Sequence, residues 1–159
     1  MVKRHRKFAK TIFVVLLICI FLGAFFIPFR TALVFYDGTT HQLAAYLPIK
    51  KGESFHIIWK HSIHLTDVIE KYKITENNAI KQDEIVYEHF GIGMPSYALE
   101  GEKFTYENGK YHIKNLNNVF PAINIRNGKT ISKHRLVWGW NGEHMIWLNH
   151  IFRRAPGMK

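Results

Sequence analysis

The chain has 159 residues, of which 47% are hydrophobic and 14% aromatic, so it is long enough for one domain with a core and too short for two. The aromatic content excludes a wholly disordered protein. Lys and Arg number 22 against 12 Asp and Glu, but five of these bases lie in the first ten residues, so we interpret the net charge of +10 mainly as a targeting signal. The one cysteine, Cys19, lies in an apolar segment, which excludes a disulfide in the remainder.

The first thirty residues have the pattern of a signal anchor. Residues 1–10 are basic, and residues 11–29 contain no charge. A helix of 19 residues spans roughly 28 Å, close to the hydrocarbon thickness of a bilayer, about 30 Å. A removable signal peptide has a shorter apolar segment, so cleavage is disfavoured. We expect a single transmembrane helix over 11–29, with the amino terminus in the cytoplasm and an extracytoplasmic domain after it.

Residues 30–152 alternate between apolar and polar over short runs, with Gly, Asn and Pro between them, which predicts strands and turns. The fold class is therefore all-β, a compact β-sandwich or partly open barrel of antiparallel strands. Helical spacing over 64–71 leaves a short helix there as an alternative, and residues 153–159 form a basic tail. The strands are expected at 32–36, 43–47, 55–61, 72–75, 85–90 and 120–125, and in two hairpins.

Each hairpin is predicted from an Asn-Gly pair, which supplies the two positive-φ residues of a tight turn. Around Asn108-Gly109 the predicted register pairs Tyr106 with Tyr111, so that apolar and polar faces separate. Around Asn141-Gly142 it pairs Trp138 with Met145.

The densest polar cluster runs from Trp59 to His64, and Glu70 follows it. Alternation places His61 on the same face as Trp59, and a strand that contains Glu70 turns this carboxyl inward as well. Two inward polar residues on adjacent strands can satisfy each other by hydrogen bonding, which makes a buried structural pair the first interpretation. A ligand pocket around the pair is the second.

Two catalytic interpretations are weaker. A hydrolase would use Ser62 as nucleophile and His61 or His64 as base, with Glu70 orienting it, but neighbouring strand residues point to opposite faces and no nucleophile motif surrounds Ser62. A metal site would gather His61, His64 and His89 with Glu70 or Glu88, but no standard ligand spacing is present. We therefore assign no catalytic residue, metal or cofactor.

The segment Phe90-Gly91-Ile92-Gly93-Met94-Pro95 follows a predicted strand. A bulged turn in which backbones approach closely is favoured over a ligand loop, because no strand-to-helix unit with a lysine follows. The predicted binding residues of the whole chain are His61, Ser62, His64, Glu70, Gly91, Gly93 and Pro95.

Four of these sequence features, spread over about 55–148, resemble a known family. They are Trp59-Lys60-His61-Ser62-Ile63, then Glu70-Lys71-Tyr72, the segment Phe90–Pro95, and His134-Arg135-Leu136. Together they are similar to the bacterial family called domain of unknown function 1850 (DUF1850). Ile63 stands where that family usually has valine, His64 stands where an acidic residue is common, and Ile92 and Met94 vary the glycine turn.

The resemblance implies a small exported or membrane-anchored protein without an established activity. It also implies an association with tripartite TRAP transporters of the TAXI type, and thus an accessory role in solute uptake. We expect a non-catalytic module that binds a transporter subunit or a small solute. A hydrolase or metal-dependent enzyme centred on His61, His64 and Glu70 is the alternative, and nucleic acid is not an expected partner.

Overall fold

The computed structural model describes residues 2–25, 31–126 and 131–153. The chain divides into two units, 1–31 and 32–159. The first contains helix α1 (Val2–Phe25). Within the described residues, no helix combines the length and the apolarity needed to cross a bilayer.

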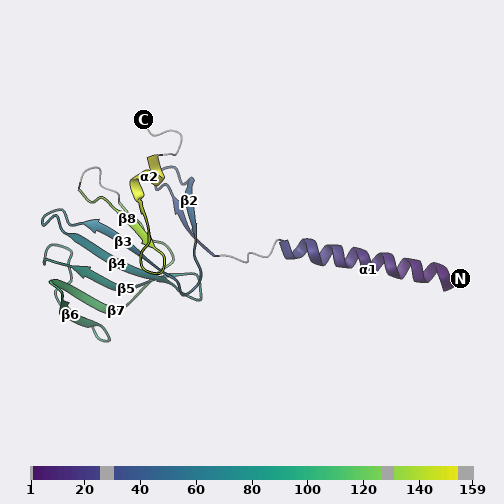
Figure 1. Cartoon of the computed structure of the whole chain (residues 1–159), viewed down its shortest axis with the longest axis horizontal. Helices are drawn as coiled ribbons and strands as arrows, with labels where there is room; N and C mark the ends of the chain where they lie inside the picture. The colour runs from purple at the N-terminus through teal and green to yellow at the C-terminus, as the bar shows by residue number, and fades with distance from the viewer. Residues whose placement is uncertain (1, 26–30, 127–130, 154–159) are drawn as a thin grey trace. The chain divides into compact units, whose positions relative to one another are not determined.

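The second unit is an all-β domain of two antiparallel sheets (Figure 1). The smaller sheet pairs β1 with β2, and the larger one has the order β6-β7-β5-β4-β3-β8-β9. A short helix, α2 (Leu148–Arg153), follows the last strand. The strands are β1 (Ala32–Tyr36), β2 (Leu43–Pro48), β3 (Ser54–Lys60), β4 (Asp67–Ile74), β5 (Ile80–Tyr87), β6 (Lys103–Glu107), β7 (Lys110–Phe120), β8 (Arg135–Trp138) and β9 (His144–Trp147).

One face of the large sheet carries two apolar clusters. The first surrounds Phe55 and Tyr72, whose rings stack with centroids 5.4 Å apart, and side chains of β1, β2 and α2 pack against it. The second lies on β4, β5 and β7 and includes Tyr87 and Ile113. Trp59 packs against both, so this one indole joins the two halves of the core.

The hairpin at Asn108-Gly109 confirms its predicted register. Both turn residues have positive φ, 53° and 78°, as a tight turn requires. Tyr106 opposes Tyr111. The predicted strands at 32–36 and 43–47 also pair as β1 and β2.

The predicted register at Asn141-Gly142 is wrong by one residue, because the connection is wider than two residues. Val137, not Trp138, opposes Met145. Residues 139–143 form the connection, in which Gly139 (φ 96°) and Gly142 (φ 71°) are both left-handed. A second glycine in this region therefore allowed a longer turn than the Asn-Gly pair alone predicts.

Two further expectations need correction, and one element was not expected. The helix alternative over 64–71 is wrong, because β4 begins at Asp67. The pattern was ambiguous because Val68 and Tyr72 are four residues apart, a spacing that places two side chains on the same face in a helix and in a strand alike. The strand expected at 120–125 is wrong, because β7 ends at Phe120 and Pro121 has no N–H to continue the ladder. Helix α2 was not predicted.

The opposite face of the large sheet is held by ion pairs. Asp67 binds Arg135 of β8, with 2.6 Å between Oδ2 and Nη2, and it also pairs with Lys60. The Glu84 carboxylate contacts the Lys71 ammonium and the His112 Nδ1. Ion pairs on this face therefore link β3, β4, β5, β7 and β8. On the other face, apolar contacts link the same strands.

The apolar clusters predict a matched pair of substitutions on β7. Ile113 is fully buried and Val119 is exposed on the same strand. Ile113→Ala should reduce the free energy of unfolding by about 2–5 kcal/mol, because it leaves a cavity in the second cluster. Val119→Ala should change it by less than about 0.5 kcal/mol. Urea unfolding of the full chain measures both, and equal effects would contradict this core.

Candidate functional site

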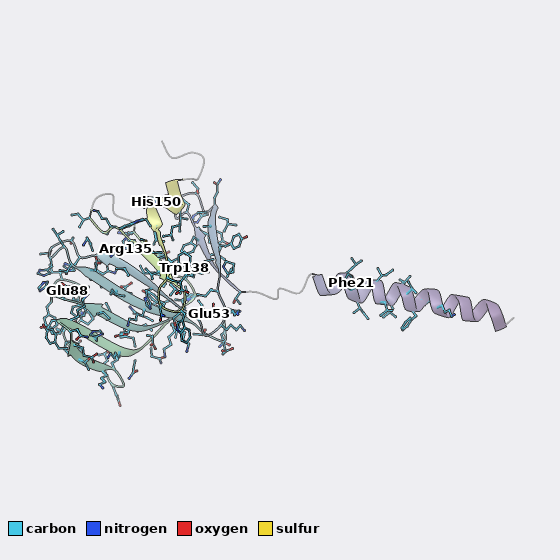
Figure 2. The ribbon with its side chains drawn as sticks, viewed as in Figure 1. Phe21, Glu53, Glu88, Arg135, Trp138 and His150 are labelled. Atoms are coloured by element: carbon cyan, nitrogen blue, oxygen red, sulfur yellow. The ribbon has the colours of Figure 1, made fainter. Side chains whose placement is uncertain are left out.

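Two loops meet at one end of the large sheet, the end that Figure 2 marks with Glu88. One is the β3–β4 loop, 61–66, which closes tightly through hydrogen bonds from Leu65 N–H to His61 O and from His61 N–H to Thr66 O, both 2.9 Å. The other is the glycine-containing segment that follows β5. Six of the seven predicted binding residues lie in these two loops, and the structure brings the loops together.

The buried imidazole of His61, only 5% exposed, joins the loops. Its Nδ1 accepts a hydrogen bond from the Ile63 N–H at 3.3 Å, and its Nε2 lies 3.4 Å from the Ile92 carbonyl oxygen. A carbonyl can only accept, so Nε2 donates to the Ile92 carbonyl oxygen. Both ring nitrogens are thus engaged by backbone groups of the two loops.

His64 forms a second bridge between the loops. Its Nε2 lies 2.9 Å from the Phe90 carbonyl oxygen, and its ring stacks on that of His61 with centroids 5.2 Å apart. The His89 ring lies at the same centroid distance from the His64 ring, tilted by 41°. The described residues nevertheless contain no group of three His, Cys, Asp or Glu side chains placed to hold a metal ion.

Gly91 lies directly against the two histidine rings. A Cβ at this position would lie 2.9 Å from His61 Cε1 and 3.3 Å from His64 Nε2. At Gly93 the reason for glycine is the backbone conformation, with a φ of 88°, and not a close contact. The segment is held further by the Tyr87 hydroxyl, which donates to the Pro95 carbonyl oxygen. The segment forms a turn closed by the Met94 N–H and the Gly91 carbonyl oxygen at 2.9 Å, and Gly91 approaches histidine side chains, whereas the predicted close approach was between backbones.

The structure does not bring Glu70 to these histidines, so the proposed His61–Glu70 pair is wrong. The register places Ile57 opposite Glu70, and His61 lies beyond the end of β3. Glu70 instead accepts a hydrogen bond from the Tyr72 hydroxyl at 2.8 Å. Alternation puts Tyr72 on the same face as Glu70, a signal that could have predicted this partner from the sequence.

The Glu70 carboxyl lies in the apolar face near Trp59, whose side chain also hydrogen-bonds to it. Burial raises the pKa of Glu70 above its ordinary value, and the hydrogen bonds from Tyr72 and Trp59 oppose this without cancelling it. The same burial, with the nearby carboxylate, raises the pKa of Tyr72. Sequence reasoning missed both partners.

Ser62 is exposed in the β3–β4 loop. The nitrogen of His61 that faces this loop already accepts the Ile63 N–H, and Glu70 lies elsewhere on the sheet. The described contacts therefore do not assemble the Ser–His–Glu arrangement that a hydrolase would use.

The exposed apolar side chains of the loops include Ile63, Leu65 and Ile92, with exposed fractions of 61%, 58% and 87%. We call these three residues the loop surface. Each is tied to His61 by a backbone hydrogen bond: Ile63 to Nδ1, Leu65 to the carbonyl oxygen and Ile92 to Nε2. His61 thus positions all three, two of them through its imidazole nitrogens and Leu65 through its backbone carbonyl.

The close contact at Gly91 predicts that any side chain there forces the loops apart. Gly91→Ala should reduce the free energy of unfolding by about 1–3 kcal/mol, because the histidine rings must move. Gly38→Ala is the matched control, since a Cβ at Gly38 meets nothing within 4 Å. Thermal and urea unfolding of the full chain compare the two, and equal stabilities would show that the rings can yield freely.

The shifted pKa values of Glu70 and Glu84 predict opposite dependences of folding stability on pH. The folded pKa of Glu70 lies above its ordinary value of 4.5, so the folded state holds this proton more tightly and stability falls as pH rises from about 4.5 through the folded pKa. For Glu84, burial alone would raise the pKa, but the interactions with Lys71 and His112 outweigh burial and keep the pKa below its ordinary value. The contribution of Glu84 to the stability of the folded state is therefore present above pH 4.5 and is lost as pH falls through the folded pKa.

The matched variants are Glu70→Gln and Glu84→Gln. Relative to the unmodified chain, Glu70→Gln should gain stability as pH rises above 4.5, whereas Glu84→Gln should lose stability as pH rises toward 4.5 from below. Urea unfolding between about pH 3 and pH 8 measures both differences. The same sign for both would refute the assignment of opposite environments.

Comparison with known proteins supports the resemblance seen in the sequence. The profile of the family described as "Domain of unknown function (DUF1850)" matches residues 55–145. This span contains all of β3 except Ser54, the whole of β4 and β5, and both loops of the site. No match was found among curated proteins or solved structures. The chain, matched over more than half its length, belongs to the DUF1850 family.

Proposed function

We propose that this chain is a non-catalytic binding module, held at a membrane by its amino-terminal segment, which contacts its partner through the loop surface. The observation that carries the proposal is the position of His61. One buried residue, His61, contacts three exposed apolar residues from two loops that are distant in sequence: Ile63 and Ile92 through its imidazole, and Leu65 through its backbone carbonyl. Exposed apolar groups held rigidly in this way are typical of an interaction site.

The hydrogen bonds of His61 favour binding over nucleophilic catalysis. A general base needs a free nitrogen directed at a nucleophile, but both nitrogens of His61 are engaged by backbone groups. His64 likewise directs Nε2 at the Phe90 carbonyl oxygen. The histidines thus act as supports for the loops, and a rigid support reduces the entropy lost when a partner binds.

The anchor and the location rest on the sequence. Residues 11–29 carry no charge, and five Lys or Arg residues precede them. This pattern supports an amino terminus in the cytoplasm and a β domain outside it. The partner we propose is a subunit of a solute transporter in the same membrane, in line with the TRAP association that the resemblance implies.

Photocrosslinking in cells tests this function. A photoreactive amino acid at Ile92 should produce a discrete adduct with a transporter subunit, identified by mass spectrometry. The matched control carries the same group at Val119, an exposed apolar position on β7. Ile92 adducts should be lost when Ile63 and Leu65 are both replaced by serine, because this removes the apolar contact without touching His61.

Two results would contradict the proposal. One is the formation of the same adduct from the photoreactive groups at Ile92 and at Val119, which would show that crosslinking reflects random encounters and not binding at the loop surface. The other is a thermal shift produced by a divalent metal ion or a small carboxylic acid and abolished by Ser62→Ala. That result would move the assignment toward the enzyme alternative.

A further inference from the structure

Strand β6 (Lys103–Glu107) is one edge of the large sheet, and Figure 1 shows it at the outer margin of this sheet. Its backbone pairs with β7 on one side, and no other strand of the described chain pairs with it. An edge of this kind presents backbone N–H and C=O groups to which another extended segment can add. The side chains of β6 indicate which segment fits.

The charged face of β6 carries a base and an acid at its two ends. Lys103 lies opposite Lys114 of β7, so two like charges face each other, and no acidic side chain of the described residues forms an ion pair with Lys103. Lys114 instead binds Glu107, with 2.9 Å between Nζ and Oε1. The Glu107 side chain remains 47% exposed, so its carboxylate is accessible to a second base from outside the sheet.

The other face of β6 carries two aromatic rings. Phe104 packs against the second apolar cluster. Tyr106 contacts Tyr111, with ring centroids 4.7 Å apart, yet it is 63% exposed because no described strand lies beyond β6. The aromatic face of the sheet therefore continues to this edge and ends there uncovered.

The order of these side chains fits a second copy of β6. Two β6 strands that pair in the antiparallel direction around Thr105 place Lys103 opposite the partner's Glu107, Phe104 opposite the partner's Tyr106 and Thr105 opposite the partner's Thr105. Opposite charges, two aromatic rings and two threonines are each among the cross-strand pairs that stabilise antiparallel strands. The pair is two-fold symmetric, which is the commonest symmetry of homodimers.

Other registers lose these matches. After a shift of two residues, Lys103 no longer lies opposite the partner's Glu107. A shift of one residue places the aromatic face of one copy beside the charged face of the other. The register around Thr105 also avoids a repulsive contact at Glu102, the acid that precedes β6, because this residue then lies beside the partner's Asn108, which is neutral.

We propose that two copies of this chain associate edge to edge through β6, so that their large sheets form one continuous antiparallel sheet. The partner's Glu107 brings an acid to Lys103, and the partner's Phe104 covers the exposed ring of Tyr106. Residues that oppose each other in such a pair share a face, so the charged faces meet on one side and the aromatic faces on the other. This association does not require the loop surface or the amino-terminal segment.

Charge complementation tests the dimer in the full chain, kept in solution with a mild detergent. Sedimentation equilibrium should give a dimer for the unmodified chain. Lys103→Glu brings two acids together at each contact and Glu107→Lys brings two bases together, so each variant alone should have a dissociation constant about tenfold higher or more. An equimolar mixture of the two variants should dimerise again, because each contact then joins one acid to one base.

The matched control is Lys73→Glu, which changes the net charge by the same amount as Lys103→Glu. Lys73 is exposed on β4, a central strand, so this variant should dimerise like the unmodified chain. A chain that is monomeric at every concentration would overturn the inference. So would a mixture that associates no more than its separate components, or equal association of the unmodified chain and both variants.

Circular dichroism shows whether each variant is folded. Glu107→Lys removes the ion pair with Lys114 inside its own chain and is the variant most at risk. Lys103→Glu removes no such pair, so it tests the dimer even if the other variant does not fold. A folded Lys103→Glu variant that dimerises as tightly as the unmodified chain would by itself overturn the inference.

Discussion

The pairing of β3 with β4 determines the position of every other part of the domain. It stacks Phe55 on Tyr72 in the first apolar cluster, and it places Trp59 where it reaches the second. It also ends β3 at Lys60, so that His61 begins the loop and turns toward the glycine segment. A shift of one residue in this register would move every one of these side chains to the other face.

The two faces of the large sheet have opposite effects on the pKa of a carboxyl group. Glu70 lies among apolar side chains with only neutral donors, and burial raises its pKa. Glu84, on the charged face, lies between Lys71 and His112, which hold its pKa down despite burial. Neighbouring strands thus place one carboxyl that favours its proton and one that favours its charge within a single sheet.

Much of the fold could be predicted from local patterns. The alternation of apolar and polar residues predicted β1, β2 and the inward position of His61. The Asn108-Gly109 pair predicted the hairpin that it closes. The connection at 139–143 could not be predicted in this way, because Gly139 widens a turn that Asn141-Gly142 would otherwise close. Nor could the site, since the contact of His61 with Ile92 depends on how β3 and β5 end, and the Glu70 partner depends on register.

The position of β8 has a consequence for folding during synthesis. β3 is a central strand of the finished sheet, yet its second partner comes from near the end of the chain. Such non-local pairing raises the contact order and slows folding. Until residues 135–138 emerge, β3 is an unpaired edge next to an apolar face, and open edges of this kind invite pairing with other chains. The nascent chain is therefore exposed to such pairing until β8 has been synthesised and has paired with β3.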